Sequence, residues 1–133
     1  MERTSTASLS GEENNDIHIV LQQLDQEVGD NECDSVTAEL IPHLRPSSWS
    51  SENLNHFRDH PFRFTGQLFL DSDHVPCRSD GSGGRPDRAS VWEIHPVYSI
   101  EICKSTKASK CDSADDKAWV LFHKFLGVDE EDQ

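Results

Sequence analysis

The stretch FRFTGQLFLD, residues 62–71, decides the fold because its side chains alternate as they do in a β-strand. One row of this stretch contains the apolar residues Phe62, Phe64, Leu68 and Leu70. Gly66 lies in the same row, and a glycine inside a strand favours a β-bulge or a close approach of another backbone. We therefore predict a strand over Phe62–Asp71 with this row in the core.

Residues 90–103 show the same alternation and predict the partner strand, which follows a glycine-rich tip at residues 78–86. The apolar row of this second strand consists of Trp92, Ile94, Tyr98, Ile100 and Ile102. The opposite row begins with Glu93 and His95, and Pro96 requires an edge or a bulge because it lacks a backbone N–H. The two segments predict a long β-hairpin whose apolar rows face the core.

Shorter elements surround the hairpin in the sequence. Residues 17–21 and 35–41 alternate as strands, residues 50–57 form a short helix with a serine N-cap, and residues 115–126 form a C-terminal helix. The expected core consists of Ile19, Leu21, Phe62, Phe64, Leu68, Trp92, Ile94, Tyr98 and Ile100. The element order predicts a mainly β protein with one short helix and a C-terminal helix.

The 133 residues fit one domain with polar ends. We expect a flexible N-terminal arm at residues 1–14, a single β-rich domain at residues 15–126 and an acidic tail at residues 127–133, because the ends contain few large apolar side chains. No window is apolar enough to span a membrane, and the first residues lack the apolar region of a secretory signal. We expect a soluble protein, and the sequence assigns no compartment.

The charge of the chain limits its partners. The sequence has 25 acidic and 12 basic side chains, which gives a formal net charge of -13. This charge repels phosphate backbones and anionic lipids, so it disfavours nucleic acid and a membrane surface as partners. It favours a cation or a basic protein surface, and we expect a protein partner.

Four cysteines leave two interpretations open. Cys103 and Cys111 flank a polar loop and could close a short disulfide ring, while Cys33 and Cys77 both lie in loops beside strands. The alternative is four unpaired thiols in a reducing compartment. No pair has the two-residue spacing of a zinc knuckle.

Two segments are rich in residues that bind metals or transfer protons. The first segment, DSDH at residues 71–74, follows the strongest strand, and the second contains Glu93 and His95, whose Cβ atoms are ~7 Å apart on one strand face. If the hairpin forms, these segments approach each other. The candidate metal ligands are His18, Glu39, Asp71, Asp73, His74, Glu93 and His95. This set suits a divalent cation such as zinc, which is the only cofactor that the sequence suggests.

The same residues have a structural interpretation. Half-exposed strands often carry Glu and His on the side that faces solvent, and the Asp-Ser-Asp-His segment could cap a strand by binding turn N–H groups. Other catalytic patterns are absent from the sequence: the glycines of the loop lack the spacing of a phosphate-binding loop, and no Gly-x-Ser-x-Gly elbow occurs.

The strand segments also resemble those of a group of uncharacterised bacterial proteins. The resemblance rests on DIHIVL at residues 16–21, TAELIP at residues 37–42, TGQLFLD with His74 after it, and EIHPV at residues 93–97. It covers roughly residues 14–103. The resemblance and the element order imply a small OB-like barrel or a curled antiparallel sheet, with the candidate site above, and imply no reaction.

Three functions stay open at this stage. The first is an acidic binding or interaction module, because the sequence contains no assembled catalytic set. The second is a divalent-metal-dependent hydrolase or metal-binding protein that uses the His and carboxylate face. The third is an OB-type nucleic-acid binder, which would require a basic groove.

Overall fold

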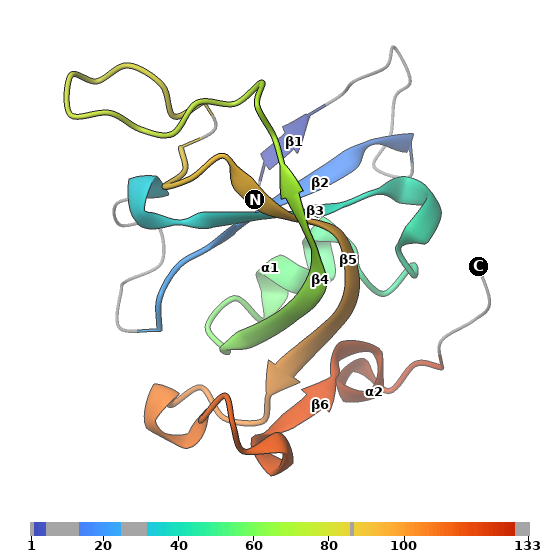
Figure 1. Ribbon diagram of the computed structural model, residues 1–133. Coiled ribbons are helices and arrows are strands. Elements are labelled where there is room, and N and C mark those ends of the chain that lie inside the picture. The colour runs from blue at the N-terminus through green and yellow to red at the C-terminus, as the bar shows by residue number, and fades with distance from the viewer. Residues whose placement is uncertain (1, 5–13, 25–31, 86, 130–133) are drawn as a thin grey trace.

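The computed structural model describes residues 2–4, 14–24, 32–85 and 87–129, and it is mainly β (Figure 1). The strands are β1 (Glu2–Thr4), β2 (Asp16–Leu21), β3 (Val36–Leu40), β4 (Phe62–Leu70), β5 (Trp92–Cys103) and β6 (Trp119–Leu121). The helices are α1 (Ser51–His56) and α2 (Phe122–Leu126), and short 3-10 turns cover Glu32–Asp34, Pro42–Leu44, Ala108–Lys110 and Asp116–Ala118. No helix in the described ranges has the length and apolar character needed to cross a bilayer.

The six strands form one mixed sheet in the order β1-β2-β3-β5-β4, and β6 pairs with the far end of β5. The expected antiparallel sheet is wrong at one pair, because β3 and β5 run parallel. The expected barrel is also wrong for the described residues: β1 and β4 end the path without pairing with each other. β1 lies within the expected arm and pairs with β2, while residues 5–13 and 130–133 fall outside the described residues.

The predicted hairpin forms, but its register is irregular in the middle. Thr65 pairs with Ser99, whereas Gly66 pairs with Val97 and Leu68 with Ile94, so β5 contains two extra residues over this stretch. Pro96 lies within this bulged stretch, as its missing N–H predicts. Each extra residue exchanges the inner and outer rows of β5.

This irregularity explains one of the wrong core predictions. Ile19 and Ile100 are buried as expected, and the half-buried side chains that pack against the core are Leu21, Phe62, Phe64 and Ile94. Tyr98 is 60% exposed and Val97 is buried in its place, because the first extra residue, between Ser99 and Val97, exchanges the rows of β5 there. The second extra residue, between Val97 and Ile94, returns β5 to its original row, and beyond it Leu68 and Trp92 are exposed, with Leu68 at 64%. Glu93, in the opposite row, is buried.

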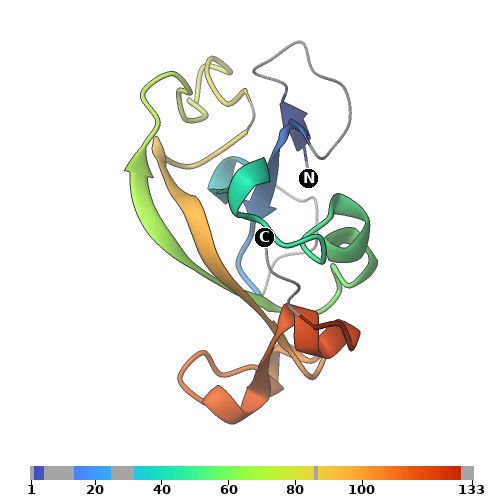
Figure 2. The same ribbon diagram turned by 90° about the vertical axis from the view of Figure 1, so that its right-hand side faces the viewer.

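The core lies between the curved sheet and the helices. Its buried apolar side chains are Ile17, Ile19, Ala38, Leu40, Trp49, Leu54, Val97, Ile100, Ile102 and Phe122. Figure 2 shows α1 on the concave side of the β4–β5 ribbon. Leu54 anchors α1 in the core, and the helix begins at the predicted serine cap, where the Ser50 hydroxyl accepts a hydrogen bond from Asn53 N at 3.1 Å.

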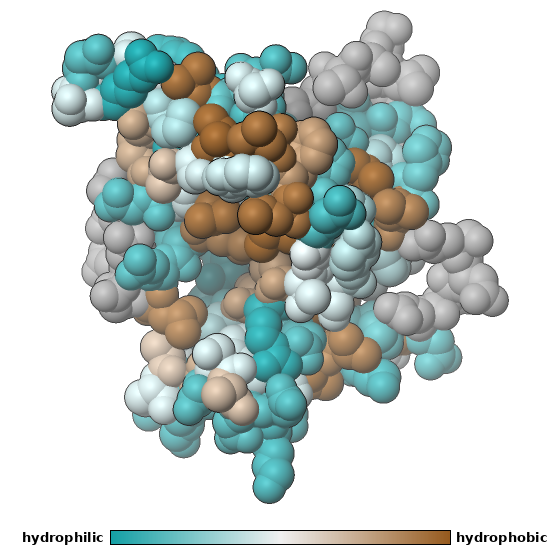
Figure 3. All heavy atoms as spheres, viewed as in Figure 1, coloured by the Kyte–Doolittle hydropathy of each residue, from teal (hydrophilic) through white to brown (hydrophobic). Residues whose placement is uncertain are grey.

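The outer face of β4 and β5 carries an apolar patch, which we define as Leu68, Leu70 and Trp92. Figure 3 shows apolar side chains gathered over the upper end of β4. Leu70 pairs with Trp92 across the two strands, and both are about half exposed. These residues belong to the rows that the sequence predicts for the core, but all three lie beyond the bulged stretch and are exposed there.

The C-terminal helix is shorter than predicted. The expected helix at residues 115–126 divides into a 3-10 turn, the strand β6 and α2, because β6 pairs with β5 and places Trp119 opposite Cys103. Asp115 caps the 3-10 turn, because its side chain accepts a hydrogen bond from Lys117 N. α2 ends at Gly127, whose φ of 72° is the left-handed conformation that glycine tolerates.

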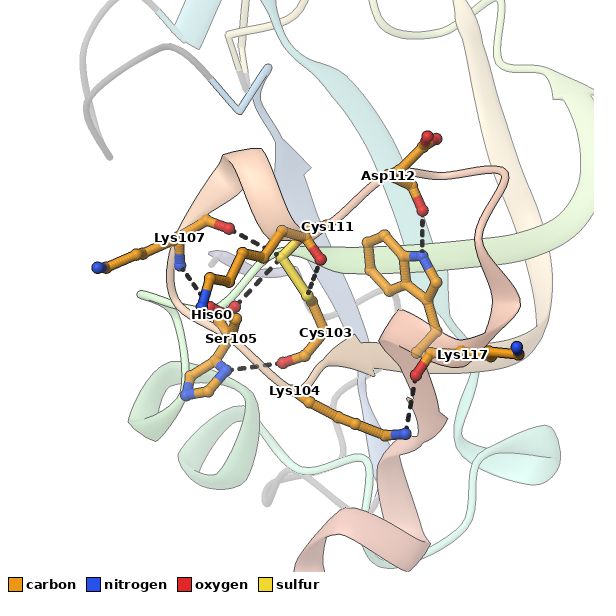
Figure 4. Close-up of a disulfide and its surroundings, with 10 residues drawn as sticks. His60, Cys103, Lys104, Ser105, Lys107, Cys111, Asp112 and Lys117 are labelled. Atoms are coloured by element: carbon orange, nitrogen blue, oxygen red, sulfur yellow. Dashed lines mark hydrogen bonds between the residues drawn. A yellow bond between two sulfur atoms is a disulfide. The ribbon is translucent and has the colours of Figure 1, made fainter.

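All four cysteines form disulfides, so the interpretation as free thiols is wrong. Cys103 and Cys111 close the short ring at the end of β5, where Cys103, Cys111 and Trp119 form a small second core (Figure 4). Cys33 and Cys77 join the start of β3 to the long loop between β4 and β5. The second disulfide therefore attaches this loop to the sheet.

Candidate functional site

The candidate site is a buried cluster of ionisable side chains on β2, β3 and β5. His18 on β2 lies directly opposite Glu39 on β3, and Glu93 and His95 follow on β5, which pairs with β3. His18, Glu39 and Glu93 are buried, and Glu93 is only 1% exposed. The alternative interpretation, in which these side chains lie on a solvent-facing side of their strands, therefore does not hold for these three residues.

Three side chains meet at the centre of the cluster. Nδ1 of His95 lies 3.0 Å from Oε2 of Glu39 and 3.2 Å from Oε1 of Glu93. One potential ligand atom from each of these three residues lies within 4.8 Å of the other two. We call Glu39, Glu93 and His95 the central triad.

The second oxygen of each glutamate is held by a basic side chain. Oε1 of Glu39 lies 3.1 Å from Nε2 of His18, and Oε2 of Glu93 lies 3.3 Å from NH1 of Arg88. Each carboxylate therefore has a fixed orientation, with one oxygen toward His95 and the other toward its base. This arrangement resembles the outer hydrogen bonds that orient metal-binding carboxylates.

The loop after β4 adds a second pair of residues. His74 contributes Nδ1 to a short hydrogen bond with Oδ2 of Asp71, and the same Asp71 oxygen lies 3.3 Å from NH1 of Arg88. The His74 ring also lies edge-on to the His18 ring, with centroids 6.4 Å apart. Asp71 and Glu93 thus share one guanidinium, which joins the loop to the central triad.

Burial and like charges alter the pKa values of the acidic groups. Burial raises the pKa of Glu93, and the hydrogen bond and negative charge of Glu39 raise it further. Burial likewise raises the pKa of Asp16, as do its hydrogen bond and repulsion with Glu39. The effect of burial on Glu39 is outweighed by its hydrogen bonds with His18 and Asp16 and by the charges of His18 and His95, so its pKa falls to about 2.

The two histidine–carboxylate pairs have related electrostatics. Burial alone would lower the pKa of His18, but the hydrogen bond and charge of Glu39 outweigh it and raise the pKa of the imidazole. Burial would raise the pKa of Asp71, but hydrogen bonds from His74 and from the Asp73 backbone outweigh it and lower that pKa. The cluster therefore stabilises the charged forms of Glu39 and Asp71 and disfavours the charged form of Glu93.

The cluster is open to solvent on one side. The side chains of His95 and His74 are 24% and 33% exposed, whereas Arg88 is fully buried behind them. The ring of Phe69 borders this opening, with its centroid 5.0 Å from that of His95. A ligand would approach through this opening.

The structure brings together most of the predicted site residues. The clustered ones are His18, Glu39, Asp71, His74, Glu93 and His95. Asp73 does not join them, because its side chain is exposed and only its backbone N–H reaches Asp71, at 3.1 Å. The sequence analysis missed Asp16 and Arg88. Asp16 immediately precedes a predicted strand, whereas no periodic signal identifies Arg88 in its irregular loop.

A cavity that the structure shows lies away from this cluster. It has a volume of about 530 Å³ and lies between the end of β2, α1 and β4, where Leu21, Leu54 and Phe64 line it. None of the clustered ionisable residues lines this cavity. We therefore base the site on the side-chain cluster and not on the cavity.

Comparisons of the chain with protein-family models, with curated proteins and with solved structures find no match. The functional argument consequently rests on the geometry and chemistry of the cluster itself.

Proposed function

We propose that this protein binds a divalent cation such as zinc through the central triad, Glu39, Glu93 and His95. The observation that carries the proposal is the convergence of two carboxylate oxygens and one imidazole nitrogen within 4.8 Å. An imidazole and two carboxylates are ordinary zinc ligands, and three protein ligands leave one position of a tetrahedral ion for water.

The spacing of the ligand atoms supports this proposal. Zinc–ligand bonds of 2.0–2.2 Å place neighbouring ligand atoms of a tetrahedron roughly 3.3 Å apart. The distances from His95 Nδ1 to the two carboxylate oxygens, 3.0 and 3.2 Å, are close to this value. A cation at the centre of the triad would take the place of the Nδ1 proton, which neutral imidazole can carry on Nε2 instead.

The charge of the cluster also supports a cation site. The carboxylates of Asp16, Glu39, Asp71 and Glu93 outnumber the single guanidinium of Arg88. Burial is the main cause that raises the pKa values of Asp16 and Glu93, and repulsion from the negative charge of Glu39 raises them further. A divalent cation would relieve this repulsion more fully than a proton does.

The proposal is tested by the thermal stability of the protein with and without metal. A cation that binds the folded state stabilises it by about 2.7 kcal/mol when its free concentration is 100 times the dissociation constant. We expect zinc to raise the melting temperature, and chelator to reverse the rise. All four cysteines are in disulfides, so thiols do not compete for zinc.

Two variants make the test specific. His95→Ala should abolish the zinc-dependent rise in melting temperature, because it removes the central ligand. His43→Ala should leave it intact, because His43 is exposed and lies in a turn outside the cluster. The proposal is wrong if zinc, manganese and calcium all leave the melting temperature of the wild type unchanged.

The apolar patch of Leu68, Leu70 and Trp92 favours a second function, the binding of another protein. β4 ends the sheet in the described residues, so both its outer face and its edge are open to a partner. Leu70→Glu should then abolish the capture of a partner that the wild type binds. Gln67→Glu, an exposed change on the same strand outside the patch, should not. Equal capture by Leu70→Glu and the wild type would contradict this function.

A further inference from the structure

We infer that Asp71 and His74 are the acid–base pair of a hydrolytic site, not ligands of the cation, and that the site transfers the acyl or phosphoryl group of an ester to water. The inference rests on the proposed cation site at Glu39, Glu93 and His95. It divides the cluster into two functional halves, one that holds the cation and one that moves a proton.

The first argument is the geometry of His74. Its Nδ1 bonds to Oδ2 of Asp71, which fixes the orientation of the ring. Nε2 is on the other side of the ring and has no hydrogen-bond partner among the described residues. A histidine that acts as a general acid–base catalyst requires this arrangement: a carboxylate bonded to one imidazole nitrogen and a second nitrogen that is free to exchange a proton.

The second argument is the position of this pair beside the central triad. Arg88 NH1 lies 3.3 Å from both Asp71 and Glu93, so one guanidinium fixes the carboxylate of the acid–base pair and one carboxylate of the triad. The His74 ring contacts the His18 ring, and His18 bonds to Glu39. His74 therefore lies one residue away from the cation position, without contacting the triad in any interaction that the structure shows.

The third argument is access. His74 and His95 are the two most exposed histidines of the cluster, and the ring of Phe69 lies beside that of His95. Solvent therefore reaches both the imidazole of His74 and the ligand imidazole of His95. The buried members, Arg88 and Glu93, orient the reacting groups from behind without touching the substrate.

These positions support a balanced hydrolysis. A water molecule gives one proton to Nε2 of His74, and its oxygen forms a bond to the carbonyl carbon or the phosphorus of the ester. The bond from that atom to the leaving oxygen breaks, and the leaving oxygen takes the proton from His74. The cation, when bound, lowers the pKa of the attacking water and stabilises negative charge on the reacting centre.

The experiment uses the full chain loaded with zinc or manganese and two chromogenic probes, bis(4-nitrophenyl) phosphate and 4-nitrophenyl acetate. The two probes distinguish phosphoryl from acyl transfer. We expect chelator-sensitive turnover of one of them by the wild type. His74→Ala should reduce this turnover by about 100-fold or more, the usual contribution of a general acid–base. Added imidazole should restore part of the lost rate.

Metal affinity is measured on the same variants by calorimetry, which separates the inference from the function on which it rests. His74→Ala should bind the cation with the wild-type affinity, and Glu93→Gln should lose both affinity and turnover. His43→Ala should change neither.

Lost cation affinity in His74→Ala would make His74 a ligand and overturn the inference. Wild-type turnover in His74→Ala would overturn it as well. A loaded wild type that turns over neither probe overturns the inference alone, whereas a wild type that binds no cation overturns the proposed function as well.

Discussion

His18 and Glu39 lie opposite each other on β2 and β3, and Nε2 of His18 is 3.1 Å from Oε1 of Glu39. Both side chains are buried, so the pair is shielded from screening by water. The contact raises the pKa of His18 and holds that of Glu39 at about 2. These opposite shifts give the protein without metal a defined pH range of greatest stability.

We expect the free energy of unfolding of the metal-free protein to fall as the pH rises above ~6.5, the ordinary pKa of histidine. Because the pKa of His18 is raised, its stabilising contribution is complete below that pH and is lost as the pH passes the higher folded-state value. Glu39 acts in the other direction at low pH: its contribution is present above ~4.5 and is lost as the pH falls toward 2. Denaturant unfolding in the presence of chelator measures both changes.

His18→Gln should reduce the loss of stability between pH 6.5 and 8.5, whereas His43→Gln should leave it as in the wild type. If the two variants show the same dependence on pH as the wild type, the His18–Glu39 contact does not control stability in this range.

A second prediction concerns Gly66, which lies where the register of β4 changes. A Cβ atom at this position would overlap the carbonyl oxygen of Pro96 and lie 2.5 Å from Cγ2 of Ile94. We expect Gly66→Ala to lower the free energy of unfolding by roughly 1–3 kcal/mol, the usual cost of overpacking. Thr65→Ala is the matched control, because Thr65 is exposed, and should cost less than ~1 kcal/mol. A Gly66→Ala protein as stable as the wild type would contradict the close approach of β5.

A third prediction tests the exchange of rows on β5. Val97 is 4% exposed and packs in the core, whereas the neighbouring Tyr98 is exposed and bonds only to Gln67, at 2.9 Å. Val97→Ala should therefore cost about 2 kcal/mol of stability, from lost burial and the cavity that remains. Tyr98→Ala should cost less than ~1 kcal/mol. If Tyr98→Ala costs more stability than Val97→Ala in denaturant unfolding, β5 follows the strict alternation that the sequence suggests, and the exchange of rows is wrong.

The elements of the fold could be predicted from local patterns, but the side of β5 that faces the core could not. Alternation identifies Phe62–Leu70 and Trp92–Cys103 as strands, and both strands form and pair. The two extra residues of β5, which lie between Ser99 and Ile94, depend on how Gly66 packs, which is a contact between distant positions. Strict period-2 counting therefore fails within the bulged stretch, where Val97 is buried instead of Tyr98.

The composition of the candidate site could be predicted more fully than its environment. Residue type and strand position were sufficient to group His18, Glu39, Glu93 and His95. Their burial could not be predicted, because both faces of β3 are covered and the sequence alone suggests one open face. The position of Arg88 depends on tertiary contacts of its loop, including the bond from Cys77 N to its carbonyl oxygen.

A fourth prediction follows from the attachment of that loop by Cys33 and Cys77. The disulfide spans 44 positions, so its loss should cost about 4 kcal/mol in the chain-entropy account, against about 2.5 kcal/mol for the Cys103–Cys111 bridge, which spans 8. Removal of the Cys33–Cys77 bridge should also weaken cation binding, because hydrogen bonds from Ala89 N and Cys77 N hold the loop segment that contains Arg88.

Cys103→Ser with Cys111→Ser is the matched control, since that bridge closes the far end of β5 beside Trp119. It should lower stability and leave the cation affinity unchanged. Equal affinity losses in the two double variants, measured by calorimetry below their unfolding temperatures, would show that the loop does not position the site.

The last prediction concerns the proton that the cation displaces. The raised pKa of Glu93 means that its carboxyl retains a proton at a pH where an ordinary glutamate is ionised. A cation must remove this proton before it binds, so its apparent affinity should increase as the pH rises through the range in which Glu93 loses its proton. Calorimetry at one pH in two buffers of different ionisation enthalpy should detect the released proton as a difference in binding heat. Identical heats in both buffers, at a pH where the wild type binds the cation and Glu93 retains its proton, would show that the cation does not bind at Glu93.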